Sequence, residues 1–207
     1  MCDSLAYILN KFHISDTAPS PIKLPMTRRN GLLVLFRELG FKTGAEIGVE
    51  AGDYSWELCR AIPGIQLYCI DPWEAYARYK DIREQPKMDR LYSEAVARLS
   101  KFNCKIIRKS SMEAVKDFAP ESLDFVYIDA NHDFEHVVND IIHWSKIVRK
   151  GGIVAGHDYR TEDEKHRAPF HVIQAVTAYT DAYNIRPVFI VKKDICPSFM
   201  WVKPQGE

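Results

Sequence analysis

AEIGVEAGDYS, residues 45–55, is the stretch that decides the fold. Its apolar start predicts a short β-strand over 45–49, and residues 55–62 predict a helix. Between them, Gly48 and Gly52 allow the backbone to approach a ligand closely, and the helix would aim its N-terminal amides at that ligand. A plain tight turn is the alternative interpretation. In both cases the stretch predicts one strand–turn–helix unit.

The same unit recurs along the chain. Apolar runs of strand length cover residues 66–70, 104–107, 123–128, 153–155, 188–191 and 199–202, and amphipathic helical patterns separate most of them. Such alternation predicts an α/β fold, a doubly wound, Rossmann-like and mostly parallel sheet of seven strands with helices on both faces. The last two runs are joined by a short loop and predict an antiparallel hairpin at the C-terminal edge. We expect Gly151-Gly152 to cap the helix predicted after residue 134.

The first 30 residues differ from the rest. A short helix is predicted over 1–12, and Pro19, Pro21 and Pro25 then indicate a linker or extended arm. We therefore expect an N-terminal helix and arm over 1–30 and one domain over 31–207. The arm is expected to pack on its own domain or to reach a neighbouring subunit, which favours a homodimer.

Composition excludes several classes of partner. The 207 residues carry 28 basic and 28 acidic side chains, so no net charge favours nucleic acid or an anionic membrane. No apolar run is long enough to span a bilayer, and the start of the chain does not resemble a signal peptide. The five cysteines are scattered without a Cys-x-x-Cys pair, which argues against disulfides and zinc. We expect a cytoplasmic protein with a small-molecule partner.

Polar residues follow the predicted strands where parallel sheets bind ligands. Asp71 ends the second strand, about 20 to 25 residues after the turn from Gly48 to Gly52, called here the glycine turn. A carboxylate at this place can accept hydrogen bonds from the hydroxyls of a ribose. A turn residue before Pro72 is the alternative. Glu50 would repel the pyrophosphate of a dinucleotide, so the acidic turn favours a cationic nucleoside.

A second group of polar residues follows the next strands. Asp129 ends the strand over 123–128, and His157-Asp158 follow the strand over 153–155. Neighbouring strands lie about 4.8 Å apart, so these side chains can converge on a divalent cation such as Mg²⁺ or Mn²⁺. His132 would then be the general base for an acceptor hydroxyl. Each of these residues has an alternative role. Asp129 would contact a cofactor, His157-Asp158 would cap the turn after the strand, and His132 would be a structural histidine.

These motifs resemble class I S-adenosylmethionine (SAM)-dependent methyltransferases. The family's first motif is an acid followed by x-Gly-x-x-x-Gly, and Glu46, Gly48 and Gly52 are similar to it. This chain has Glu50 where many members carry glycine. Asp129-x-x-His132 before GGIVAGHDY (151–159) resembles the macrocin O-methyltransferase-like and cephalosporin-hydroxylase-like subgroup, over roughly residues 40–160.

The resemblance implies SAM as cofactor and methyl transfer to a small-molecule acceptor, at a hydroxyl oxygen and with a divalent metal. It implies a catalytic set of Asp129, His132 and His157 and a metal set of Asp129, His157 and Asp158. The implied cofactor residues are Glu46, Gly48, Glu50, Gly52, Ser55, Asp71, Pro72, Trp73, Ser110, Ser111, Met112 and Asp129. Core positions for Trp73 and Met112 are the alternatives, and a nucleotide-cofactor oxidoreductase or a non-catalytic SAM-binding module are the alternative functions.

Two polar segments are candidate lids. Residues 73–87 mix aromatic and arginine side chains, and residues 159–169 form a charged loop directly after the predicted metal site. Each is equally consistent with an ordinary surface segment.

Overall fold

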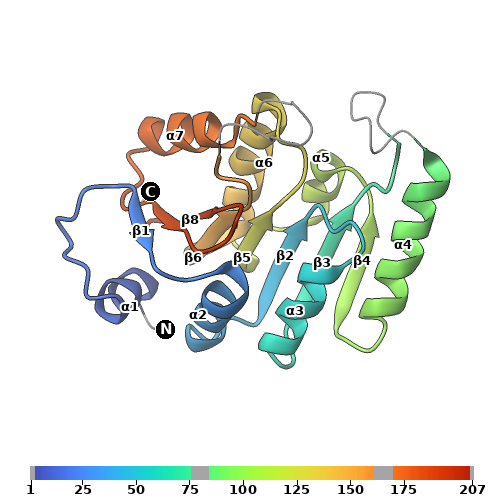
Figure 1. The fold of residues 1–207 in the computed structure, drawn as a ribbon, viewed down its shortest axis with the longest axis horizontal. Helices are drawn as coiled ribbons and strands as arrows, with labels where there is room; N and C mark the ends of the chain where they lie inside the picture. Colours follow the sequence, from blue (N-terminus) through green and yellow to red (C-terminus); the bar gives the residue numbers. More distant parts are fainter. Residues whose placement is uncertain (1–2, 76–83, 161–169, 206–207) are drawn as a thin grey trace.

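The computed structural model describes residues 3–75, 84–160 and 170–205, so most of both candidate lids lies outside the described residues. Its centre is one mixed sheet with the strand order β1-β7-β8-β6-β5-β2-β3-β4 (Figure 1). The strands are β1 (Ile22–Leu24), β2 (Thr43–Ile47), β3 (Gln66–Asp71), β4 (Cys104–Arg108), β5 (Leu123–Ile128), β6 (Val148–Gly156), β7 (Phe189–Val191) and β8 (Ser198–Val202). The helices are α1 (Ser4–Lys11), α2 (Leu33–Glu38), α3 (Asp53–Ala61), α4 (Gln85–Leu99), α5 (Ser111–Ala114), α6 (Phe134–Ile147) and α7 (Val172–Ala182), with a π-helical turn η1 (Arg28–Leu32) and a 3-10 turn η3 (Val115–Asp117).

The helices cover both faces of the sheet, as predicted. Figure 1 shows α2, α3 and α4 along one side and α5, α6 and α7 along the other. Strand β5 supplies both cores by alternation: Phe125 and Tyr127 pack with the first group, and Val126 and Ile128 with the second. Burial on both faces explains why this strand is a nearly continuous apolar run.

The sheet has one strand more than the seven expected. Residues of the proline-containing segment form β1, which pairs in parallel with β7 through Ile22 and Phe189. The antiparallel pairing of β7 with β8 is confirmed, but β1 lies outside this hairpin and forms the edge. The sequence did not predict this strand because it has only three residues and lies between Pro21 and Pro25.

The N-terminal segment packs on its own domain. Ile8 is fully buried, and the Ser4 hydroxyl donates a 2.6 Å hydrogen bond to the carbonyl of Gly151. Gly151 and Gly152 lie inside β6 and do not cap α6, so that expectation was wrong. The pairing of β5 with β6 shifts register between Leu123 and Phe125, and Gly151 has a φ of 70° beside this irregularity.

Among the described residues, every helix is too short or too polar to cross a membrane.

Candidate functional site

The candidate site lies beyond the carboxyl ends of β2, β3, β5 and β6. Strand β2 pairs with β3 on one side and with β5 on the other, so the chain reverses its direction of winding at this point. Open α/β sheets bind ligands at such a switch point. The topology therefore places the glycine turn, Asp71 and Asp129 together at the carboxyl edge of the sheet, where folds of this kind have their ligand-binding crevice.

Gly48 is required by a close approach of two loops. It has a φ of 90°, and a Cβ atom there would lie 2.2 Å from the carbonyl oxygen of Asp129. The two loops are held by backbone hydrogen bonds from Gly48 to Ile70 (2.9 Å) and from Asp129 to Ile47 (2.7 Å). Only glycine avoids both the left-handed strain and the collision. Gly52, with a φ of 80°, begins α3 as its N-cap.

Asp71 holds the glycine turn in place. One carboxylate oxygen accepts hydrogen bonds from the amides of Val49 and Glu50, both 3.0 Å, and the other accepts from the amide of Trp73 at 2.7 Å. Burial raises the pKa of Asp71, although these three donors oppose the shift. The carboxylate thus organises the turn from the tip of β3.

Trp73 fixes the same turn from inside the protein. Its indole is 1% exposed, donates a 2.8 Å hydrogen bond to the carbonyl of Glu50 and packs edge-on against Tyr92. The structure therefore places Trp73 in the core, which was the alternative to a cofactor contact. Pro72 is half-buried between Asp71 and Trp73, and the side chain of Glu50 is exposed at the rim.

Glu46 and Ser55 form a buried pair under α3. Glu46 is 2% exposed and accepts a hydrogen bond from the Ser55 hydroxyl. Burial raises the pKa of Glu46 to about 8, and the hydrogen bond from Ser55 opposes the rise. Both side chains face the interior, where they fix α3 against β2 and so position the start of the helix.

The loop after β4 is anchored to α6. Ser110 begins α5 with a capping box, in which its amide donates a 3.1 Å hydrogen bond to the carboxylate of Glu113. Its hydroxyl donates to the same carboxylate at 2.6 Å. The Ser111 hydroxyl donates to the carboxyl of Asp140 and accepts a 2.8 Å hydrogen bond from the indole of Trp144. Met112 packs against the core on the α6 side of the sheet.

Asp140 is a buried acid that sequence reasoning missed. It is 4% exposed, and burial raises its pKa to about 7 against the hydrogen bond from Ser111. In the sequence, Asp140 stands in the apolar stripe of α6, one helical turn before Trp144. An acid at such a position needs a polar partner when it is buried, and this could have identified it.

Two acids and two histidines converge at the tips of β5 and β6: Asp129, His157 and Asp158, which were expected to meet there, and His132. The Nε2 atom of His132 lies 3.1 Å from Asp158 and 4.0 Å from Asp129. The Nδ1 atom of His157 lies 3.5 Å from Asp129 and 3.4 Å from Asp158. The four side chains therefore form one cluster, supplied by the loop after β5 and the end of β6.

Three of these residues fit a divalent cation. One ligand atom from each of Asp129, His132 and Asp158 lies within 4.8 Å of the other two. The Nε2 atom of His132 is buried and lies 3.1 Å from the carboxylate of Asp158. A donor set of two carboxylates and one imidazole, completed by water or substrate oxygens, suits Mg²⁺ or Mn²⁺. His157, expected as a ligand, lies beside this trio and contacts both carboxylates.

The charges of the cluster are coupled. Burial lowers the pKa of His157, but contacts with Asp129 and Asp158 outweigh it and raise the value to about 9. Burial raises the pKa of Asp158, but His132 and His157 outweigh it and hold the carboxyl far below its usual range. The cluster therefore keeps Asp158 ionised at neutral pH.

Two arginines border the cluster, and neither was expected from the sequence. Arg28 of η1 lies 3.4 Å from Asp129, and Arg160 lies 3.1 Å from Asp158. The ring of Phe170 contacts both His132 and Arg160, with distances of 4.3 Å between ring centroids and 4.6 Å from the guanidinium carbon. Arg28 comes from the proline-containing segment, where no periodic pattern marks a residue of the site.

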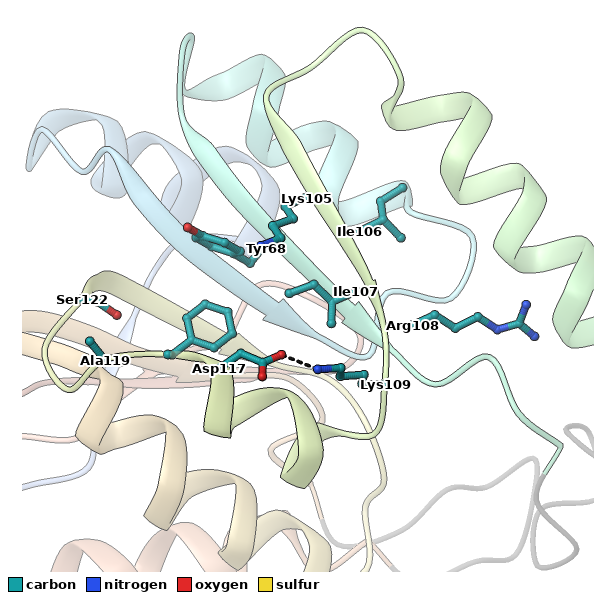
Figure 2. A pocket seen from close by; sticks show the side chains of 10 residues that line it. Tyr68, Lys105, Ile106, Ile107, Arg108, Lys109, Asp117, Ala119 and Ser122 are labelled. Carbon is teal, nitrogen blue, oxygen red and sulfur yellow. Dashed lines mark hydrogen bonds and ion pairs between the residues drawn. The ribbon is translucent and has the colours of Figure 1, made fainter.

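A hollow of about 560 Å³ lies elsewhere, along the edge strand β4 and under η3 (Figure 2). The ion pair of Lys109 with Asp117, 2.5 Å long, lies at one end of it, and Tyr68 and Phe118 are among its apolar lining residues. It contains none of the candidate site residues. Its basic edge is typical of lysines that protect an open strand from pairing, so we do not assign the site to it.

Comparison with known proteins matches residues 45–159 to a family described as a methyltransferase domain. No curated protein matches the chain in sequence.

Among solved structures, an O-methyltransferase from Bacillus cereus in complex with SAH (S-adenosylhomocysteine) superposes with a TM-score of 0.60 at 16% identity, covering 98% of this chain and 92% of that chain. The O-methyltransferase TomG from Streptomyces achromogenes, in complex with SAM, has a TM-score of 0.60 at 18% identity and covers 98% and 91%. An O-methyltransferase family protein from Burkholderia thailandensis has a TM-score of 0.61 at 13% identity, and there the match covers 85% of this chain but only 56% of that chain. At these identities the likeness establishes the Rossmann-like fold.

Proposed function

Because this chain belongs to the methyltransferase domain family and is a class I SAM-dependent methyltransferase, we propose that it methylates a hydroxyl oxygen of a small molecule at a site that also holds a divalent cation. The cluster of Asp129, His132 and Asp158 beside the glycine turn is the observation that carries this proposal. Family membership decides against the nucleotide-cofactor oxidoreductase.

In this proposal the glycine turn, Asp71 and the loop at Ser110 surround the nucleoside. The oxygen of Asp71 that accepts from the amide of Trp73 has a second lone pair for a ribose hydroxyl, whereas the other oxygen already accepts two hydrogen bonds, from Val49 and Glu50. Gly48 and Gly52 keep side chains out of the turn. Glu46, Ser55, Trp73 and Ser111 act behind it as supports, since their polar atoms are bonded to other parts of the protein.

Asp129, His132 and Asp158 would hold the cation. When bound, the cation would lower the pKa of the acceptor hydroxyl and orient its oxygen toward the methyl donor. We therefore assign His132 to a ligand position, whereas the sequence had suggested a general base. His157, in contact with both carboxylates, keeps them oriented.

Several structural neighbours carry the name O-methyltransferase, which supports oxygen as the accepting atom. A hydroxyl is also the group that a hard cation with oxygen ligands binds best. Methylation of a nitrogen atom would not need a cation at Asp129, His132 and Asp158.

Methyl transfer from radiolabelled SAM to a panel of phenols, catechols and sugars tests the proposal. We expect products that require Mg²⁺ or Mn²⁺ and decrease about 100-fold with EDTA or in Asp158→Asn, while calorimetry gives an unchanged affinity for SAM. Asp117→Asn, the same substitution in the distant ion pair with Lys109, is the matched control and should keep full activity.

Three outcomes contradict different parts of the proposal. Methyl transfer that is unaffected by both EDTA and Asp158→Asn would contradict the role of the cation. Tight SAM binding without any product favours a non-catalytic SAM-binding module. Absence of SAM binding removes the proposal as a whole.

A further inference from the structure

Arg28 stands at the crevice with its backbone fixed from two sides. Its amide donates a 2.6 Å hydrogen bond to the carboxylate of Asp194, between β7 and β8. Thr27 caps the same turn by accepting a 2.9 Å hydrogen bond from the amide of Asn30. The segment before α2 therefore holds this one arginine at a defined place over the tip of β5.

The guanidinium group lies among aromatic rings and one acid. Its carbon is 5.1 Å from the centre of the Tyr54 ring, and it also interacts with the hydroxyl of Tyr127. Burial lowers the pKa of Arg28, but Tyr127, Asp129 and Tyr54 outweigh it, so the group stays charged. Only 20% of the side chain is exposed. A charge this deep in the protein needs strong partners.

The contact with Asp129 does not saturate the guanidinium. The distance of 3.4 Å exceeds the roughly 2.7–2.9 Å typical of a charge-assisted hydrogen bond. It also uses only one of the five N–H donors of an arginine. Together, the contacts with Asp129 and with the hydroxyl of Tyr127 leave further N–H donors for a better acceptor that enters the crevice beside Asp129.

The remaining charges of the crevice define that acceptor. Glu50, Asp71, Asp129 and Asp158 are acidic, and Arg160 is already paired with Asp158 at 3.1 Å. The amino-acid end of SAM carries both an ammonium and a carboxylate. Acids can bind the ammonium and the ribose hydroxyls, but the carboxylate needs a donor.

We propose that Arg28 binds the carboxylate of the amino-acid end of SAM through its guanidinium fork, while the Oδ2 atom of Asp129 that now faces Arg28 accepts the neighbouring ammonium. The Oδ1 atom of Asp129 faces the two histidines, so the same residue separates the cofactor from the cation cluster. This inference rests on the proposed function, because it needs SAM in the crevice.

Calorimetry with a pair of ligands tests the inference. The first ligand is S-adenosylhomocysteine, and the second is its decarboxylated analogue, which keeps the adenosine, the sulfur and the amine. The wild-type protein should bind the first about 10- to 100-fold more tightly, the usual contribution of hydrogen bonds to a charged group. This comparison needs no variant, so it stands even if a variant fails to fold.

Variants then assign the preference to one side chain. Arg28→Met should lower the affinity for S-adenosylhomocysteine by about the same factor and leave the decarboxylated analogue unchanged or bound more tightly, since Asp129 loses a competitor for the amine. Arg28→Lys should retain part of the preference. Arg29→Met, in the same turn but paired with Glu57 at 3.2 Å and half-exposed, is the matched control and should behave as the wild type.

The outcomes are separable. Equal losses for both ligands in Arg28→Met, or no loss for either, overturn the role of Arg28 and leave the proposed function intact. A wild-type protein that binds neither ligand overturns the proposed function itself.

Discussion

Replacing Gly48 with alanine should lower the free energy of unfolding by about 2–5 kcal/mol, since two separate costs act at this position. The left-handed backbone costs an L-residue about 1–2 kcal/mol. The new Cβ would also lie 2.2 Å from the carbonyl oxygen of Asp129, and such overpacking typically costs about 1–3 kcal/mol. The carbonyl cannot retreat easily, because the amide of Asp129 is bonded to Ile47 at 2.7 Å.

Gly64→Ala isolates the second cost. Gly64 has a similar φ of 79°, but a Cβ atom added there would meet no atom of the described part of the chain within 4 Å, so only the backbone cost applies. Urea denaturation of both variants gives the difference directly, and we expect Gly48→Ala to be less stable than Gly64→Ala by about 1–3 kcal/mol at an unchanged m-value. Equal stability of the two variants would refute the close approach of the glycine turn to Asp129, on which the geometry of the crevice depends.

Three further predictions concern the buried groups around the crevice. Burial raises the pKa of Asp140 from 3.8 to about 7, so the folded state retains a proton that the unfolded state releases, and stability should decrease by about 3 kcal/mol between pH 4 and pH 7. Asp140→Asn should flatten this part of the profile in denaturant titrations, and an unchanged profile would contradict the role of Asp140. Ser55→Ala removes the hydrogen-bond donor to Glu46, whose pKa is raised by burial to about 8. Because the ionised carboxylate needs this donor most, thermal unfolding should show a larger loss of stability above pH 8 than at pH 6, and equal losses would argue against the pair. Trp73→Phe removes the hydrogen bond to the carbonyl of Glu50 and should weaken SAM binding in calorimetry about 3- to 10-fold, whereas unchanged binding would show that the turn does not need this support.

Much of the site follows from sequence because strand ends are local features. The apolar run of residues 123–128 ends at Asp129 and that of residues 153–155 ends near His157-Asp158. Parallel pairing of β5 with β6 then brings these residues together without any further information. The convergence of Asp129 with His157 and Asp158 was therefore predictable from the order of the elements alone.

Side-chain direction was not predictable in the same way. The turn at Trp73 has a φ of 45°, which directs the indole into the core, and no sequence pattern specifies that conformation. The hydroxyl of Ser111 faces Asp140 because of the rotation of α6 over the sheet, which depends on tertiary packing. For this reason the sequence did not predict that the indole of Trp73 is bonded to the carbonyl of Glu50, or the hydroxyl of Ser111 to Asp140.

Contacts between residues far apart in the sequence could not be predicted either. Arg28 reaches Asp129 across 101 positions of sequence, from a segment whose prolines indicate only an extended arm. Its placement depends on β1 pairing with β7 and on Asp194 binding its amide. Such contacts emerge from the folded topology and leave no periodic signal.

The crystal structure of the protein with S-adenosylhomocysteine and Mn²⁺ tests the central claim most directly. We predict the ribose at Asp71, the ligand's carboxylate at Arg28, and an anomalous manganese peak among Asp129, His132 and Asp158. A nucleoside bound in the hollow along β4, or a crevice that stays empty at saturating ligand, would contradict the account.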